Sequence, residues 1–234
     1  MNHFLKKVYS TLIPSKTLKY AYLKSSPKAI LINELQLIYL PIPKVANRSI
    51  KEVLADKTEK SGKLSAHKYD WDYISLKKTF ESSYYSFAFV RNPLDRLVSC
   101  YMQKSSKRKL TMNFWKYGNA IWEGMSFEDF ANFVCDTPDS LADRHFKSQH
   151  HFLYQNNRLN VDFLGKFENL VNDWEQVASR FELRQLNHSN KSEHKDWKHY
   201  YNKKLANKVA NRYQKDIALF EYSEIVGSII ERLK

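Results

Sequence analysis

Short apolar runs alternate with amphipathic stretches along most of this chain. The apolar runs predict buried strands, and apolar positions repeated every three or four residues predict helices that pack on them. The strand pattern occurs at residues 37–40, 86–90 and 161–167, and the helix pattern at 47–54, 93–101, 126–135, 170–181, 200–213 and 217–233. This order predicts a three-layer α/β fold, with a central parallel sheet between two layers of helices.

The segment after the first predicted strand is suited to binding an anion. It runs from Leu37–Leu40 through a polar turn into a helix. The first N–H groups of a helix have no partner within it, and its dipole adds positive potential there. Lys44, Arg48 and Ser49 supply further donors for phosphate. The segment lacks the glycines and the Gly-Lys-Ser/Thr ending of a Walker A loop, and an ordinary turn with exposed basic residues is the alternative.

A second strand, Ser86–Val90, leads directly into another helix. Asn92 is a good N-cap residue and Pro93 fits the first helical position. Arg91 therefore leaves the carboxyl end of the strand, where ligands of open α/β sheets bind. Ser99 follows about two helical turns later and faces roughly the same way.

Together these two segments resemble the sulfotransferases, specifically the Golgi-type carbohydrate sulfotransferases (family 2). The resemblance extends to Asp143–Gln149, which is similar to the Asp-x-His-aromatic-x-x-Gln segment of that family, to residues 164–174, and to Asp216, Phe220 and Tyr222 near the end. It runs from about Leu37 to about Tyr222 and implies one P-loop-like sulfotransferase domain over residues 1–234, in which residues 1–35 are an unmatched helical extension.

The resemblance implies that the enzyme transfers the sulfuryl group of 3′-phosphoadenosine-5′-phosphosulfate (PAPS) to a hydroxyl of a carbohydrate. Arg91 and Ser99 would bind the 3′-phosphate. Lys191 or Ser192, in a polar segment, would reach the same phosphate, although a solvated linker is an equal alternative. The 5′-phosphosulfate would lie on the first loop, formed by Lys44, Val45, Ala46, Asn47, Arg48, Ser49 and Ile50.

Three residues are candidates for the general base that takes the proton of the acceptor hydroxyl. The resemblance favours His67, and an imidazole with an ordinary pKa of about 6.5 suits that role. His145 is the second candidate, and it could instead orient the acceptor. Glu168, at the end of the third strand, is either a base or a structural residue. Lys44 would stabilise charge on the departing phosphate.

Composition narrows the class of protein. The chain has 234 residues, 43% of them hydrophobic, which suits one domain with a substantial core. The two cysteines, Cys100 and Cys135, are expected to be thiols. A zinc site near His145, His150 and His151 is not expected, because no carboxylate or cysteine completes a recognised spacing, and we predict no metal.

A formal net charge of +13 predicts an anionic partner. The lysines are spread along the chain rather than gathered in one arm, so nucleic acid is not expected, and a carbohydrate that is already anionic fits the charge. A kinase that uses ATP and a basic nucleic-acid-binding protein remain the alternative functions. Residues 1–14 have the spacing of an amphipathic helix that either docks on the domain or contacts a membrane surface. Without a signal peptide or a spanning segment, we expect a cytoplasmic enzyme.

Overall fold

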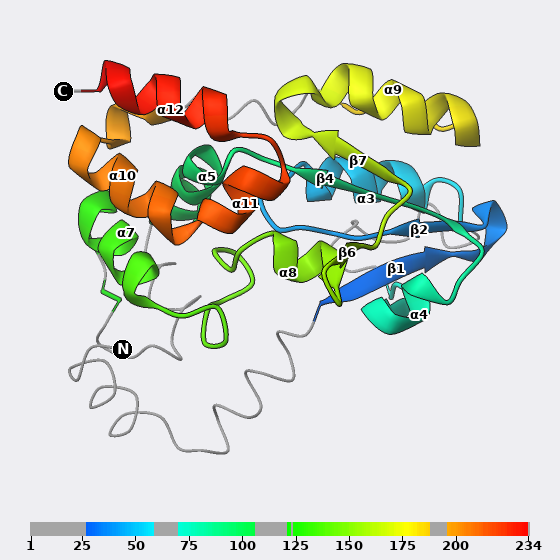
Figure 1. Ribbon diagram of the computed structural model, residues 1–234. Coiled ribbons are helices and arrows are strands. Elements are labelled where there is room, and N and C mark those ends of the chain that lie inside the picture. The colour runs from blue at the N-terminus through cyan, green and yellow to red at the C-terminus, as the bar shows by residue number, and fades with distance from the viewer. Residues whose placement is uncertain (1–26, 59–69, 106–120, 123, 188–195, 234) are drawn as a thin grey trace.

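A mixed five-stranded sheet lies at the centre of the computed structural model, which describes residues 27–58, 70–105, 121–122, 124–187 and 196–233 (Figure 1). The strand order is β3-β1-β2-β4-β7. The strands are β1 (Lys28–Ile32), β2 (Leu37–Tyr39), β3 (Tyr73–Ser75), β4 (Tyr85–Val90) and β7 (Phe163–Lys166), and a separate hairpin joins β5 (Tyr154–Gln155) to β6 (Arg158–Leu159).

The sheet is parallel only across β2, β4 and β7. The predicted α/β class is therefore confirmed. The prediction of a parallel central sheet is wrong for its β1 side, because β1 runs antiparallel to both β2 and β3. A short turn, η1 (Asn33–Leu35), joins β1 to β2, and Gln36 closes it in the left-handed region at φ 48°. The chain thus reverses within a few residues, and part of the expected helical extension is a strand of the sheet.

The helices follow the predicted pattern closely. Five of them (α5, α7, α10, α11 and α12) gather beyond the end of β4, at the left of Figure 1, and α9 lies along β7. The helices are α3 (Asn47–Ala55), α4 (Leu76–Phe80), α5 (Pro93–Ser105), α7 (Phe127–Asp136), α8 (His150–Leu153), α9 (Leu170–Phe181), α10 (Lys203–Arg212), α11 (Gln214–Leu219) and α12 (Ser223–Arg232), with 3-10 turns η3 (Phe167–Asn169) and η4 (Trp197–Tyr200).

Two helix boundaries differ from the sequence prediction. The predicted helix 217–233 is split between α11 and α12, because Glu221 adopts φ 58°, which no right-handed helix can contain. The predicted helix 200–213 begins later, at Lys203, since the side chain of Asn202 caps it by accepting from the N–H of Leu205. The caps predicted at Asn92 and Ser126 are confirmed: Asn92 Oδ1 accepts from Leu94 N at 3.0 Å and Ser126 Oγ from Asp129 N at 3.1 Å.

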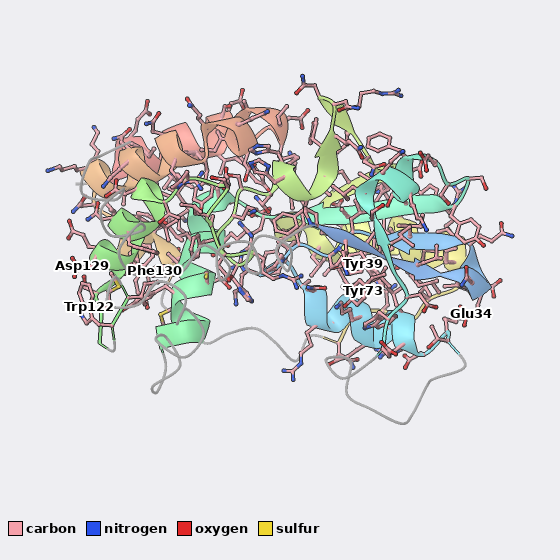
Figure 2. All side chains as sticks on the ribbon, turned by 90° about the horizontal axis from the view of Figure 1, so that it is seen from below. Glu34, Tyr39, Tyr73, Trp122, Asp129 and Phe130 are labelled. Carbon is pink, nitrogen blue, oxygen red and sulfur yellow. The ribbon has the colours of Figure 1, made fainter. Side chains whose placement is uncertain are left out.

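Aromatic packing fixes β4 between its neighbours. Tyr39 of β2 stacks on Phe87 with ring centroids 4.9 Å apart, and the fully buried Trp174 of α9 lies against Phe87 and Phe89. Gly165 of β7 lies directly against the Phe89 ring, where an added Cβ would come within 2.3 Å. Figure 2 labels Tyr39, a residue of the sheet, and Phe130 in the group of helices. This packing holds the carboxyl ends of β2, β4 and β7 at one edge.

Several predictions concern residues that the structure does not describe. His67, Lys191, Ser192 and the segment 1–14 all lie outside the described residues. Both cysteines are thiols, as expected, with Cys100 buried and Cys135 half-buried. Among the helices of the described ranges, none has the length and apolar character needed to cross a membrane.

Candidate functional site

The loops that follow β2, β4 and β7 meet around Arg91. The Arg91 guanidinium donates from Nη1 to the carbonyl oxygen of Lys44 at 3.1 Å, and it lies 4.1 Å from the ring centroid of Phe167. The next backbone N–H, that of Asn92, donates to Glu168 Oε1 at 2.7 Å. Arg91 therefore joins the loop after the first parallel strand to the turn after the third, at the carboxyl ends of the strands, where ligands of open α/β sheets bind.

The loop Lys44–Ala46 is shaped by two left-handed residues. Lys44 has φ 74° and Ala46 φ 44°, a conformation that costs free energy in residues other than glycine and marks sites where the chain must turn sharply. Ala46 is the N-cap of α3, and its methyl group cannot accept a hydrogen bond from the helix. The first turn of α3 thus keeps N–H donors that no cap side chain satisfies, which is the arrangement of an anion site.

Some of the other predicted loop residues are buried and fix the loop to the core, and others are exposed to solvent. Val45 and Ile50 are buried in the core and Ser49 is also buried, while Asn47 Oδ1 accepts from the Tyr39 hydroxyl at 3.3 Å. Arg48 is exposed and pairs with Glu52 at 3.6 Å. The loop is therefore held from beneath, and Lys44, Asn47 and Arg48 are its side chains nearest to solvent.

Asp95 and Ser99 lie one turn apart on α5, and Arg91 lies just before that helix. Asp95 accepts from Arg91 Nε and Nη2, both at 2.8 Å, and Ser99 lies one further turn along. Ser99 is half-buried, whereas its neighbours Leu97, Val98 and Cys100 are buried. The ion pair with Asp95 holds the Arg91 guanidinium toward the side of α5 on which Ser99 follows one turn later.

Gln149 and Asp216 support Arg91 from the side of α8 and α11. The Gln149 side chain holds both backbone groups of Arg91: Oε1 accepts from Arg91 N at 3.0 Å and Nε2 donates to Arg91 O at 2.8 Å. The fully buried Asp216 accepts from the N–H of Gln149 at 2.6 Å and from His150 Nδ1 at 2.6 Å. The sequence pattern contained Gln149 and Asp216 but gave no sign that they act together.

Glu168 serves a structural role in the fold. Its Oε1 accepts from Asn92 N, and its Oε2 accepts from the Tyr222 hydroxyl at 2.8 Å. Burial, together with the Glu168 carboxylate, raises the pKa of Tyr222 above its usual range, so this hydroxyl keeps its proton and donates it to the bond. Both carboxylate oxygens are engaged, which favours the structural interpretation of Glu168 over a role as base.

His145 is paired with a carboxylate. Its Nδ1 lies 2.6 Å from Asp143 Oδ1, which also accepts from the backbone N–H of His145 at 3.0 Å. A hydrogen bond from Nδ1–H places the proton of the neutral ring on that nitrogen, so Nε2 is the basic nitrogen. This arrangement orients an imidazole as a proton acceptor.

Arg96 ties the segment of His145 to the first loop. It is almost fully buried, at 2% exposure, and donates to the carbonyl oxygens of Pro43 (3.0 Å), Lys147 (2.9 Å) and Arg144 (3.2 Å). A buried guanidinium that donates to backbone carbonyls fixes several chain segments at once. Sequence analysis did not single out Arg96.

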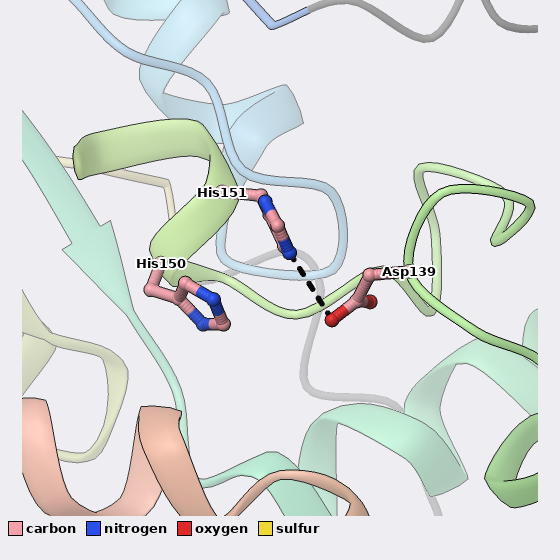
Figure 3. Close-up of side chains that lie close together, drawn as sticks. All are labelled: Asp139, His150 and His151. Atoms are coloured by element: carbon pink, nitrogen blue, oxygen red, sulfur yellow. Dashed lines mark ion pairs between the residues drawn. The ribbon is translucent and has the colours of Figure 1, made fainter. Parts of the chain in front are cut away.

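Three side chains, Asp139, His150 and His151, lie close enough to resemble a metal site (Figure 3). Asp139 supplies the carboxylate that spacing alone did not reveal. However, both of its oxygens accept from Arg212, at 2.7 and 3.2 Å, and Oδ2 lies 3.2 Å from His151 Nε2. Burial alone would raise the pKa of Asp139, but hydrogen bonds from His151 and Arg212 lower it well below its usual range. The adjacent guanidinium would repel a cation, so this cluster is better described as an ion-pair centre.

Comparison with curated proteins finds carbohydrate sulfotransferases. The chain is 25% identical to carbohydrate sulfotransferase 14 of Mus musculus over 221 residues, and 25% identical to carbohydrate sulfotransferase 14 of Homo sapiens over 166 residues. These matches cover 80% and 61% of this chain but 58% and 43% of the relatives, so the chain spans about half the length of the curated relatives it matches.

These relatives also correct the expected location. The prediction of a cytoplasmic enzyme is wrong, because carbohydrate sulfotransferase 14 of either species is a Golgi-type enzyme. That prediction rested on the pattern of the given sequence alone, and the relatives outweigh it.

A family model covers most of the chain. The model of a sulfotransferase family matches residues 28–223, which begin at β1 and end at the start of α12. The matched range includes the loop after β2, Arg91, the Asp95–Ser99 turn of α5 and the segment of His145. A phosphate-loop kinase and a basic nucleic-acid-binding protein are not favoured by this match. The chain belongs to the sulfotransferase family.

Proposed function

We propose that this chain transfers the sulfuryl group of PAPS to a hydroxyl of a carbohydrate. The observation that supports this most directly is the hydrogen bond from Arg91 Nη1 to the carbonyl of Lys44, at 3.1 Å. It joins the two segments suited to phosphate at one edge of the sheet. A nucleotide with separate 5′ and 3′ phosphate groups needs two such segments at a fixed separation.

The described residues would hold the donor nucleotide at both of its phosphate groups. The first turn of α3 and Lys44 would hold the 5′-phosphosulfate, with Asn47 and Arg48 at the rim of the loop. Arg91 would hold the 3′-phosphate with the N–H groups not directed at Asp95 and Lys44, and Ser99 would add its hydroxyl. Lys191 remains a proposed further contact to the same phosphate.

The transfer is an in-line displacement at sulfur. The acceptor hydroxyl oxygen forms a bond to sulfur while the bond from sulfur to the bridging phosphate oxygen breaks, and adenosine 3′,5′-bisphosphate leaves. Lys44 stabilises the negative charge that develops on the bridging oxygen. The hydroxyl proton passes to a base, and fixing both reactants in line supplies much of the rate. The scheme assigns no step to a metal ion.

We assign the base to His67, and His145 is the second candidate because Asp143 orients its ring. The experiment measures transfer of radiolabelled sulfate from PAPS to a panel of oligosaccharides, with binding of adenosine 3′,5′-bisphosphate measured in parallel. His67→Ala should abolish turnover and leave bisphosphate binding within about twofold of the wild type. His145→Ala tests the second candidate base in the same two assays.

The variants His67→Ala and His145→Ala distinguish between the two candidate bases. Full turnover in His67→Ala together with its loss in His145→Ala would move the role of base to His145. No transfer to any hydroxyl of the panel by a wild-type protein that binds the bisphosphate would contradict carbohydrate sulfation.

A further inference from the structure

The peptide group between Arg91 and Asn92 is held from two sides by side chains that are distant in the sequence. It lies where β4 ends and α5 begins. The Gln149 side chain accepts from Arg91 N at 3.0 Å and donates to Arg91 O at 2.8 Å. From the other side, Glu168 Oε1 accepts from Asn92 N at 2.7 Å. Side chains therefore engage both polar atoms of this peptide group, and also the backbone N–H of Arg91.

The Gln149 amide does for Arg91 what a neighbouring strand does for a residue of a sheet. In an antiparallel ladder, a residue exchanges an N–H bond and a C=O bond with the residue opposite. Gln149 offers Arg91 the same acceptor and the same donor, directly after the last residue of β4. The backbone of Arg91 thus has one position, and the bonds to Asp95 and to the Lys44 carbonyl then fix its side chain.

Gln149 is in turn held by Asp216, a residue in the first turn of α11. This carboxylate is fully buried, and it accepts from Gln149 N at 2.6 Å, from His150 N at 2.9 Å and from His150 Nδ1 at 2.6 Å. Figure 1 shows α11 beside α8, on which it packs. Because hydrogen bonds to an ionised carboxylate are strong, Asp216 fixes the backbone from which the Gln149 side chain extends.

Glu168, on the other side of the peptide group, is held by Tyr222. The fully buried Tyr222 hydroxyl donates to Glu168 Oε2 at 2.8 Å, while the other oxygen of that carboxylate accepts from Asn92 N. Tyr222 directly follows the left-handed Glu221, at which the chain turns from α11 to α12. Residues 216–222 therefore support the same peptide group along two separate lines of hydrogen bonds.

We propose that the segment 216–222 positions Arg91 for the 3′-phosphate of the donor nucleotide. The segment acts through Gln149 on one side and through Glu168 on the other. This inference rests on the proposed function, and it adds residues that raise affinity for the 3′-phosphate through Arg91 rather than by a contact of their own. A guanidinium that is already fixed loses little freedom when it binds phosphate, so its affinity exceeds that of a mobile one.

The test compares adenosine 3′,5′-bisphosphate with AMP, because only the bisphosphate has a 3′-phosphate. Both are titrated by calorimetry into the full chain. The variants are Gln149→Met, Asp216→Asn and Tyr222→Phe, and circular dichroism shows that each is folded. The control is Tyr101→Phe, which removes a hydroxyl that donates to the Met125 carbonyl at 2.8 Å, among the helices beyond the end of β4.

The affinity ratio of bisphosphate to AMP should fall by about fivefold in Gln149→Met and by about threefold in Asp216→Asn and in Tyr222→Phe. Affinity for AMP, and both affinities of the control, should stay within about twofold of the wild type. When Arg91 is already lysine, Gln149→Met should lower the ratio by less than about twofold, since the residue through which it acts has been replaced. Tyr222→Phe removes only one oxygen, so it decides the matter if Gln149→Met does not fold.

An unchanged ratio in folded Gln149→Met, or in both Asp216→Asn and Tyr222→Phe, would overturn the inference. Equal losses for AMP and the bisphosphate would also overturn it, because they would assign these residues to the stability of the whole fold. A full further loss on adding Gln149→Met to Arg91→Lys would show that Gln149 does not act through Arg91. A wild type that binds AMP as tightly as the bisphosphate would instead contradict the proposed function.

Discussion

The Arg91 guanidinium is held by Asp95 through two hydrogen bonds of 2.8 Å, from Nε and from Nη2. The pair is nearly buried, with 13% and 12% of the two side chains exposed, so it is little screened by solvent. Because Nη1 donates to the Lys44 carbonyl, Arg91 has one orientation and joins α5 to the first loop. The geometry of this planar group is therefore as important as its charge.

Replacement of Arg91 by lysine tests that geometry. Arg91→Lys keeps the positive charge, but an ammonium cannot bridge Asp95 and the Lys44 carbonyl with the same fork of donors. We expect affinity for adenosine 3′,5′-bisphosphate to fall by about tenfold or more. Calorimetry measures this, with the exposed Arg158→Lys as the control. Wild-type affinity in Arg91→Lys would show that charge alone suffices.

Ser99→Ala tests the second proposed donor to the 3′-phosphate, which lies on α5. Removal of one hydrogen bond to a charged phosphate should weaken bisphosphate binding by about tenfold, since such bonds contribute roughly 1.5–3 kcal/mol. Binding of AMP, which lacks the 3′-phosphate, should not change. Ser228→Ala, on the exposed surface of α12, is the matched control. An equal loss for both nucleotides would place Ser99 away from the 3′-phosphate.

Arg96 is expected to be a major contributor to stability. Arg96→Met leaves the carbonyls of Pro43, Arg144 and Lys147 without their donor in the interior, so unfolding in urea should become easier by about 3 kcal/mol. Arg184→Met removes an exposed pair with Asp56 and should cost less than about 1 kcal/mol. Equal losses in the two variants would contradict the role given to Arg96.

Lys51 gives the protein a pH-dependent stability. Its pKa is about 8 in the folded state and 10.5 as the ordinary value, so the unfolded chain holds the proton more tightly. The full destabilisation is present below pH 8 and disappears as pH rises from 8 to 10.5. Lys51→Met should therefore stabilise the protein below pH 8, and the gain should shrink across that window. A gain that is constant with pH in paired urea titrations would contradict the shifted pKa.

The parallel part of the fold was predictable because its signals are local. The apolar runs at 37–40 and 86–90 became β2 and β4, and the caps Asn92 and Ser126 act as their side-chain chemistry indicates. The strand β1 was not predicted, because its pairing depends on the turn at Gln36. This residue adopts a left-handed conformation that its residue type does not predict. The break at Glu221 was missed for the same reason.

The supporting contacts of the site could not be derived from spacing. Gln149 lies 58 positions from Arg91, and Asp216 lies 67 positions from Gln149. Only the folded chain therefore reveals that Asp216 supports Gln149 and that Gln149 supports Arg91. Likewise Asp139 joins His150 and His151 from a different segment, and Arg96 reaches carbonyls 48 to 53 residues away. Long-range hydrogen bonds of this kind have no local pattern.

The most direct test of the central claim is a calorimetric titration with adenosine 3′,5′-bisphosphate, compared with AMP and with ATP plus magnesium. The two phosphate segments joined by Arg91 predict that the bisphosphate binds at least about tenfold more tightly than AMP, and that a chelator does not alter its binding. Equal affinity for AMP and the bisphosphate, or a preference for ATP that depends on magnesium, would contradict the account.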